Sequence, residues 1–259
     1  MLSPLFLVLG VVFILGSSIG SFLNVCIYRV PNGESIVSPP SSCPKCKNRL
    51  RWYHNIPVLG YAFLGGRCGF CGLPISLRYP FVEILTGALF LLVFYYFCFC
   101  PLSFVYWLFL SLLIVVSFID LDHQVIPDVI SIPGIFLGLI CSFLIPWIDW
   151  FDSFLGAFLG AAILLSIALL YKYLVGRDGM GMGDVKLLAM LGSFLGWKSI
   201  FPIVFLASLI GTVIGVPLMM ARRQTGALAL PFGPFLAFAA TIYLFWGEAI
   251  IQWYLGFYD

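Results

Sequence analysis

Residues 103–120 read SFVYWLFLSLLIVVSFID, a stretch in which the only charged side chain is the aspartate that ends it. At 1.5 Å of rise per residue, an apolar helix of this length is long enough to cross the hydrocarbon layer of a bilayer. Similar runs recur along the chain and predict about eight membrane spans, at residues 4–27, 80–98, 103–120, 129–147, 153–174, 185–198, 200–220 and 231–248. The sequence therefore predicts an all-α polytopic membrane protein.

The composition excludes a water-soluble domain and a disordered chain. Of the 259 residues, 62% are hydrophobic and 9% are charged, and the mean hydropathy is +1.10. So few charged side chains cannot cover the surface of a soluble fold of this size. The net charge of +2 is small and its carriers are scattered, so membrane lipid rather than nucleic acid is the expected surrounding.

The basic residues predict the orientation, because short cytoplasmic connections accumulate Lys and Arg. With the N-terminus outside, every one of the 13 Lys and Arg residues except Lys198 falls on the cytoplasmic side. Both termini are then outside. Three domains are expected: a first transmembrane helix at 1–27, a cytoplasmic loop domain at 28–79 and a transmembrane domain at 80–259. The first span differs from a signal peptide because no basic residue precedes it and Arg29 follows it, so we expect a retained helix.

The polar loop contains two C-x2-C pairs, Cys43 with Cys46 and Cys68 with Cys71, separated by 21 residues. Two such turns can offer four thiolates to one tetrahedral zinc ion. A site closed by four thiolates has no open position, so the expected zinc is structural. Disulfides are the alternative, although a cytoplasmic loop lies in a reducing compartment, and His54 is a weaker candidate ligand.

Two acidic clusters follow membrane spans on the predicted cytoplasmic side. One contains Asp120, Asp122 and Asp128, and the other is the run Gly179–Lys186, which reads GMGMGDVK and holds Asp184. Ionisable groups at the membrane are costly, so each one is a candidate functional residue unless it reaches water. Solvated loop charges are the alternative, and Asp128, directly before a predicted helix, is also a candidate helix cap.

Two partly desolvated carboxylates brought close together share a proton, so that one acts as a base and the other as an acid. Such a pair can hydrolyse a peptide bond through an activated water molecule. The glycines beside Asp184, among them Gly181 and Gly183, would let a substrate backbone approach closely. The glycine run lacks the order of a phosphate-binding loop, but a helix-packing face is a remaining alternative.

These motifs, in this order, resemble those of the bacterial type IV prepilin peptidases, which are membrane aspartyl proteases. The resemblance covers nearly the whole chain. Besides the cysteine pairs it rests on Gly20–Arg29, Trp52–Leu59, Ile75–Pro80 with Glu83, Asp120–His123, Ile126–Asp128, Gly181–Lys186 and Pro231–Phe235.

The resemblance implies cleavage of a basic leader peptide from type IV prepilins or type II secretion pseudopilins at the cytoplasmic face of the bacterial inner membrane. It assigns the catalytic pair to Asp120 and Asp184. Asp122 is the nearest alternative to Asp120 as the first member of this pair. It also implies a second activity, methylation of the new N-terminus by S-adenosylmethionine. Lys186 would either favour the ionised form of Asp184 or only reach toward lipid phosphate.

Two readings from other classes stay open at this stage. An ion-coupled transporter would use Asp120 and Asp184 as an ion site, although both lie near predicted helix ends rather than at the bilayer midplane. A non-catalytic scaffold would use the zinc loop to dock partners.

Overall fold

The computed structural model describes residues 4–43, 45–176, 180–221 and 231–256, and its regular structure there is entirely helical. Gly179, the first residue of the predicted glycine run, lies outside these ranges. The elements in chain order are α1 (Pro4–Arg29), η1 (Trp52–Asn55), α2 (Leu59–Phe63), α3 (Arg78–Phe97), α4 (Pro101–His123), α5 (Asp128–Cys141), η2 (Ser142–Leu144), α6 (Trp150–Val175), α7 (Met182–Leu195), η3 (Trp197–Ser199), α8 (Ile200–Ala221) and α9 (Gly233–Leu255).

The prediction of an all-α polytopic membrane protein is confirmed. Each of the eight predicted spans coincides with a helix, and six of these, α1, α3, α4, α6, α8 and α9, are long and apolar enough to cross a membrane. The other two, α5 and α7, have 14 residues each. The runs expected at 129–147 and 185–198 are therefore real helices, but they are shorter than a full span.

The chain forms two compact units, Met1–Val115 and Val116–Asp259. The first contains the cysteine loop, and the second, which begins within α4, contains both Asp120 and Asp184. The domain boundaries expected at residues 27/28 and 79/80 remain a prediction.

In the first unit, α1 and α3 pack through glycines. Gly16 and Gly20 of α1 lie very close to α3. A Cβ added at Gly16 would lie 2.9 Å from Cα of Gly87, and one added at Gly20 would lie 2.8 Å from Cα of Glu83. Small residues allow helix backbones to approach in this way where lipid supplies no hydrophobic drive between them. This contact fixes the C-terminal half of α1 against the start of α3, from which the cysteine loop extends.

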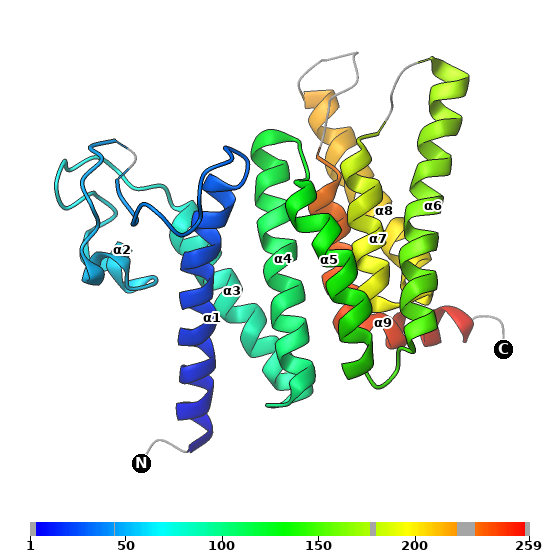
Figure 1. Cartoon of the computed structure of the whole chain (residues 1–259), viewed down its shortest axis with the longest axis horizontal. Helices are drawn as coiled ribbons and strands as arrows, with labels where there is room; N and C mark the ends of the chain where they lie inside the picture. Colours follow the sequence, from blue (N-terminus) through cyan, green and yellow to red (C-terminus); the bar gives the residue numbers. More distant parts are fainter. Residues whose placement is uncertain (1–3, 44, 177–179, 222–230, 257–259) are drawn as a thin grey trace. The chain divides into compact units, whose positions relative to one another are not determined.

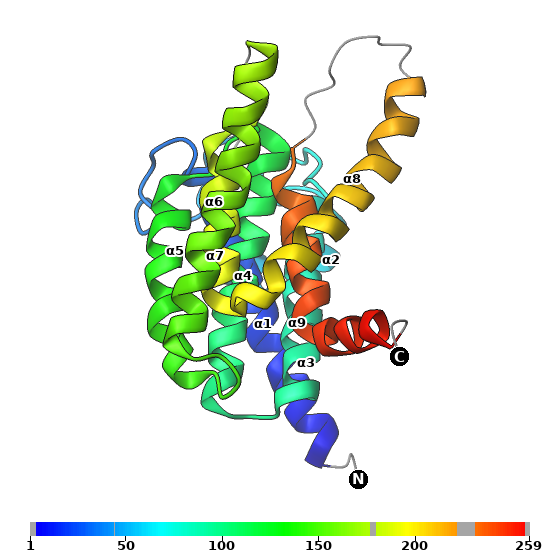
Figure 2. The same cartoon turned by 90° about the vertical axis from the view of Figure 1, so that its right-hand side faces the viewer.

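In the second unit, α7 is the central helix, in contact with α5, α6, α8 and α9 (Figures 1 and 2). From Val185 to Leu195 every residue of α7 except Lys186 is buried. Gly156 of α6 packs directly on Gly192, and the Ser153 hydroxyl donates to the Ser193 carbonyl at 2.5 Å. This tight packing gives the N-terminal turn of α7, and thus Asp184, a rigid support.

Candidate functional site

The four predicted metal ligands come together in the first unit. The Sγ atoms of Cys43, Cys46, Cys68 and Cys71 all lie within 4.8 Å of one another. Four thiolates around one zinc ion at about 2.3 Å stand about 3.8 Å apart, so the cluster is compatible with tetrahedral zinc. All four are free cysteines rather than disulfides. His54 is not part of the cluster; its ring packs edge-on against Tyr53 at 4.5 Å.

The two cysteine turns have the same backbone geometry. The N–H of Cys43 donates to the carbonyl five residues later at 3.0 Å, and the N–H of Cys68 donates in the same way at 2.8 Å. The residue after the second cysteine of each turn has a positive φ, which is 58° for Lys47 and 69° for Gly72. Backbone N–H groups of Cys71 and Phe70 lower the pKa of the Cys68 thiol to about 6. At Cys68 the turn therefore favours the thiolate form that zinc binds.

Asp120 lies in the last turns of α4 and is only 5% exposed. Its Oδ2 atom accepts a hydrogen bond of 3.0 Å from the backbone N–H of Gly233, the first residue of α9. The first N–H groups of a helix have no partner within it, so the start of α9 supplies a donor to a buried carboxylate. A Cβ at Gly233 would lie 2.7 Å from the same oxygen. This close approach therefore requires glycine.

Asp184 lies half-buried in the first turn of α7, outside the six candidate spans. Burial, and then the negative charge of Asp120, raise the pKa of Asp184 to about 7. A Cβ added at Gly181 would lie 4.0 Å from Asp184 Oδ2 and 3.9 Å from the backbone N of Gly183. No other described atom lies within 4 Å of this position beside the carboxylate.

Ile126 joins the two carboxylate-bearing segments. It is 6% exposed, and a Cβ added at Gly183 would lie 2.9 Å from its Cβ, while one added at Gly233 would lie 3.2 Å from its Cδ1. The segment between α4 and α5 is therefore wedged between the start of α7 and the start of α9. Asp120 and Asp184, 64 positions apart in the chain, come near enough for the charge of Asp120 to act on Asp184.

Lys186 forms an ion pair that neither sequence-based interpretation predicted. Its Nζ atom donates to Asp128 Oδ1 at 2.6 Å, which ties the first turn of α7 to the first turn of α5. The helix-cap interpretation of Asp128 is wrong, because Pro127 occupies the N-cap position and no side-chain cap hydrogen bond forms. Asp122, the competitor for the first catalytic role, is exposed on the final turn of α4.

Gly233 is the functional residue that sequence reasoning missed. Its motif, Pro231–Phe235, contributed to the family resemblance, but no role followed from it. The signal was Pro234 just inside a helix start, which marks a position where backbone N–H groups lack partners.

A polytopic helical membrane unit that carries two electrostatically coupled carboxylates defines a class of candidate membrane hydrolases. Comparison with known proteins gives the family: residues 14–97 match the bacterial peptidase A24 N-terminal domain, and residues 107–216 match the type IV leader peptidase family. A prepilin leader peptidase/N-methyltransferase of Pseudomonas aeruginosa is 37% identical, over 94% of this chain and 92% of that protein. Proteins of the same name from Aeromonas hydrophila and Myxococcus xanthus are 36% and 41% identical, over 95% and 86% of this chain and 93% and 66% of those proteins.

The chain therefore belongs to the type IV leader peptidase family. These matches carry peptidase names, so nothing in them favours the transporter reading. No solved structure matches the chain.

Proposed function

We propose that this protein removes the basic leader peptide from type IV prepilins or type II secretion pseudopilins and then methylates the new N-terminus. Support for the peptidase comes from its family and, in the structure, from one observation: two carboxylates from different helices share a site. One accepts a hydrogen bond from a helix N-terminal amide, and burial together with the charge of the first raises the pKa of the other to about 7. We assign Asp120 and Asp184 as the catalytic pair, with Gly181, Gly183 and Lys186 in support.

A carboxyl pair that shares one proton contains both an acid and a base. The ionised member takes a proton from water, whose oxygen attacks the scissile carbonyl carbon, while the protonated member donates to the carbonyl oxygen. When the tetrahedral intermediate collapses, the C–N bond breaks and the dyad returns a proton to the leaving amine. Asp184 acts as the initial acid because its pKa is raised, and Asp120, hydrogen-bonded to Gly233, acts as the base.

The substrate has the shape that this arrangement requires. A prepilin carries a basic leader followed by an apolar helix, so the helix lies in the bilayer while the leader remains with the cytoplasmic residues. The orientation with both termini outside places the cysteine loop and the carboxylate pair on the cytoplasmic face of the bacterial inner membrane. The cysteine cluster would hold one zinc ion that stabilises the loop domain at 28–79 and takes no part in the chemistry.

Replacement of either carboxylate tests the peptidase assignment. Asp120→Asn and Asp184→Asn should each reduce leader removal by about 10³-fold or more, because an amide neither shares a proton nor activates water. Cleavage of a purified prepilin in proteoliposomes measures this loss, and membrane fractionation checks insertion. Asp122→Asn is the matched control, since that side chain is exposed at the same helix end. Near-normal cleavage by either dyad variant, or loss of cleavage in Asp122→Asn alone, would contradict the assignment.

A further inference from the structure

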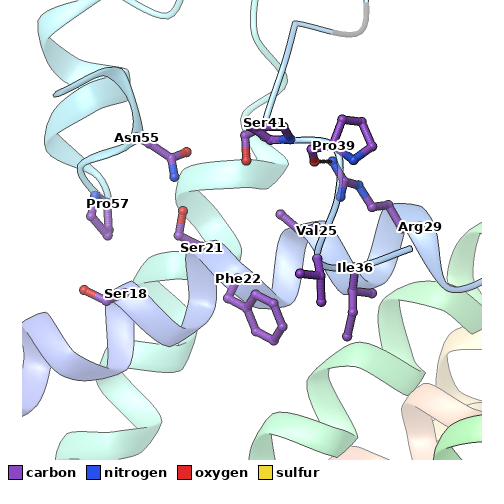
Figure 3. A pocket seen from close by; sticks show the side chains of 12 residues that line it. Ser18, Ser21, Phe22, Val25, Arg29, Ile36, Pro39, Ser41, Asn55 and Pro57 are labelled. Atoms are coloured by element: carbon purple, nitrogen blue, oxygen red, sulfur yellow. Dashed lines mark hydrogen bonds between the residues drawn. The ribbon is translucent and has the colours of Figure 1, made fainter. Parts of the chain in front are cut away.

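The first unit contains a cavity of about 350 Å³ that the peptidase site does not use (Figure 3). One side of it is the C-terminal half of α1, and the other sides are loop segments before and after the first cysteine pair. Its volume lies in the range of pockets that take small organic ligands. The lining residues are Ser18, Ser21, Phe22, Val25, Arg29, Ile36, Val37, Pro39, Pro40, Ser41, Asn55 and Pro57.

The cavity lining has an apolar part and a polar part. Phe22 and Val25 from α1, with Ile36 from the loop, offer an apolar surface that includes one aromatic ring. Hydroxyl and amide groups come from the serines of α1 and from Asn55. Such a mixed lining suits a ligand with a flat heteroaromatic ring and several polar groups.

A buried cation lies at one end of the cavity. Arg29 is 8% exposed, and two of its guanidinium nitrogens donate to the carbonyls of Ser35 at 2.9 Å and Pro39 at 2.7 Å. These bonds hold the loop against α1. They leave the positive charge without a carboxylate partner among the described ion pairs, and a guanidinium has further N–H groups to donate. An anionic group on a ligand would therefore be stabilised here.

A buried carboxylate, outside the lining itself, interacts with Ser21 of the cavity wall. Glu83 of α3, which is 8% exposed, interacts with the hydroxyl of Ser21 and accepts a hydrogen bond of 2.7 Å from the backbone N–H of Val58. Val58 has φ 62° and ψ −50°, a strained conformation for a β-branched residue, and the neighbouring Leu59 N–H closes a tight turn on the Pro57 carbonyl at 2.6 Å. Strain of this kind persists where the surrounding structure fixes it, commonly at ligand sites.

We infer that this cavity binds the methyl donor S-adenosylmethionine. The inference rests on the proposed methylation activity and gives it a place in the first unit, separate from the carboxylate pair of the second. The ligand has one group for each part of the lining: an adenine ring for the apolar surface with Phe22, ribose hydroxyls for the serines and Asn55, and a carboxylate for Arg29. Its sulfonium cation is favoured by a site backed by the Glu83 carboxylate.

The transfer itself needs no further reactant. The unprotonated amine nitrogen of the new N-terminus attacks the methyl carbon, and the S–CH₃ bond breaks as the N–C bond forms. The electron pair of the broken bond stays on sulfur, which becomes the neutral thioether of S-adenosylhomocysteine. The methylated ammonium then releases one proton to water.

Filling the cavity tests the site directly. Ser18→Leu adds side-chain volume to the cavity from α1, and Asn55→Leu removes its polar group from the loop side. Each substitution should weaken the affinity for S-adenosylmethionine at least tenfold. Titration calorimetry on the purified full chain in detergent measures this affinity. Ser166→Leu is the matched control, because Ser166 is also an exposed helical serine whose hydroxyl bonds the carbonyl four residues earlier, but it lies on α6. This control should bind like the wild type. Thermal unfolding of every variant identifies any that fail to fold.

A second measurement locates the ligand without substitution. Ultraviolet cross-linking of labelled S-adenosylmethionine to the wild-type chain, followed by peptide mapping, should label residues between Ser18 and Pro57. Equal affinity in folded Ser18→Leu and Asn55→Leu, or label confined to the second unit, would overturn the inference and leave methylation at another site. A wild-type chain that cleaves prepilin but binds no S-adenosylmethionine would also overturn it, while the peptidase function would stand.

Discussion

Asp120 and Gly233 join two distant parts of the chain within the second unit, because the backbone N–H of Gly233 donates at 3.0 Å to a carboxylate oxygen 113 positions earlier. Such a bond holds the carboxylate in one rotamer and stabilises its charged form. Because Oδ2 of Asp120 is held by the Gly233 N–H, Oδ1 of Asp120 is the oxygen left to accept a proton from water. In the proposed mechanism, the orientation of Asp120 as the base therefore depends on the backbone N–H of a glycine.

Gly233→Ala tests this dependence. The new Cβ would displace Asp120 Oδ2, which lies 2.7 Å from its position, and a hydrogen bond to a charged group contributes about 1.5–3 kcal/mol. Leader cleavage should fall about 10- to 150-fold in kcat, with a smaller change in KM. Gly10→Ala is the control, because a Cβ there meets nothing within 4 Å. A cleavage rate in Gly233→Ala equal to that of the control would show that the amide does not position the base.

The raised pKa of Asp184 predicts a pH dependence. Burial and the Asp120 charge place this pKa at about 7. Below it the pair holds the one proton that the mechanism needs, and above it both carboxylates are ionised and no acid remains. The value of kcat/KM should therefore decline as pH rises through about 7, as measured in proteoliposomes at constant ionic strength. The pair titrates as a unit, so the midpoint belongs to both residues; a rate that increases from pH 7 to pH 9 would contradict the assignment of Asp184 as the acid.

At the level of elements, Asp120 interacts with the first turns of α9 and α7. Gly233 donates its N–H to Asp120 Oδ2, and the charge of Asp120 acts on Asp184. The unpaired N–H groups and positive dipole end of a helix start favour negative charge nearby. The Lys186–Asp128 ion pair connects the first turns of α7 and α5 at 2.6 Å, and we expect it to position the turn that carries Asp184.

Removal of either partner of this ion pair should loosen that turn. Lys186→Met and Asp128→Asn should each slow cleavage about fivefold, equivalent to about 1 kcal/mol, which is the upper range for a partly exposed ion pair. The double variant should be no slower than either single variant, because the two substitutions remove the same interaction. Lys198→Met, at an exposed lysine of η3, provides the control. Fully multiplicative losses in the double variant would mean that the two side chains act independently.

The same elements show how far the sequence alone leads. Helix positions were predictable because an apolar run of span length has few other structures available in a membrane. The cysteine cluster was predictable because its ligands are encoded locally, in two C-x2-C turns. The Gly233 contact was not, since a backbone N–H leaves no trace in side-chain pattern and its partner is 113 positions away. The ion pair of Lys186 with Asp128 was not predicted for a related reason: the two residues are 58 positions apart, and only the packing of α5 on α7 brings them together.

At the level of the whole molecule, the two units use different sources of stability. The second unit is held by helix packing around the buried α7. Among its described residues, the cysteine loop has as regular structure the short helices η1 and α2 and two isolated bridges, Ser42 with Arg49 and Arg67 with Pro74, each enclosing one cysteine pair. A polar segment with so little regular structure buries too little apolar area to order itself, so metal ligation is the expected source of its stability.

Metal removal should therefore affect the loop and leave α7 intact. Pure protein should contain about one zinc per chain, lost in Cys43→Ser and Cys68→Ser. After chelation, hydrogen exchange measured by mass spectrometry should accelerate across residues 42–74, while the amides of α7 keep their protection because their packing contains no metal ligand. The Cys141→Ser variant is the control, since Cys141 lies at the end of α5 and outside the cluster, and it should retain both the zinc and the exchange pattern. A loop that exchanges equally with and without chelator would mean that its fold depends on the bridges and on Arg29 rather than on a metal ion.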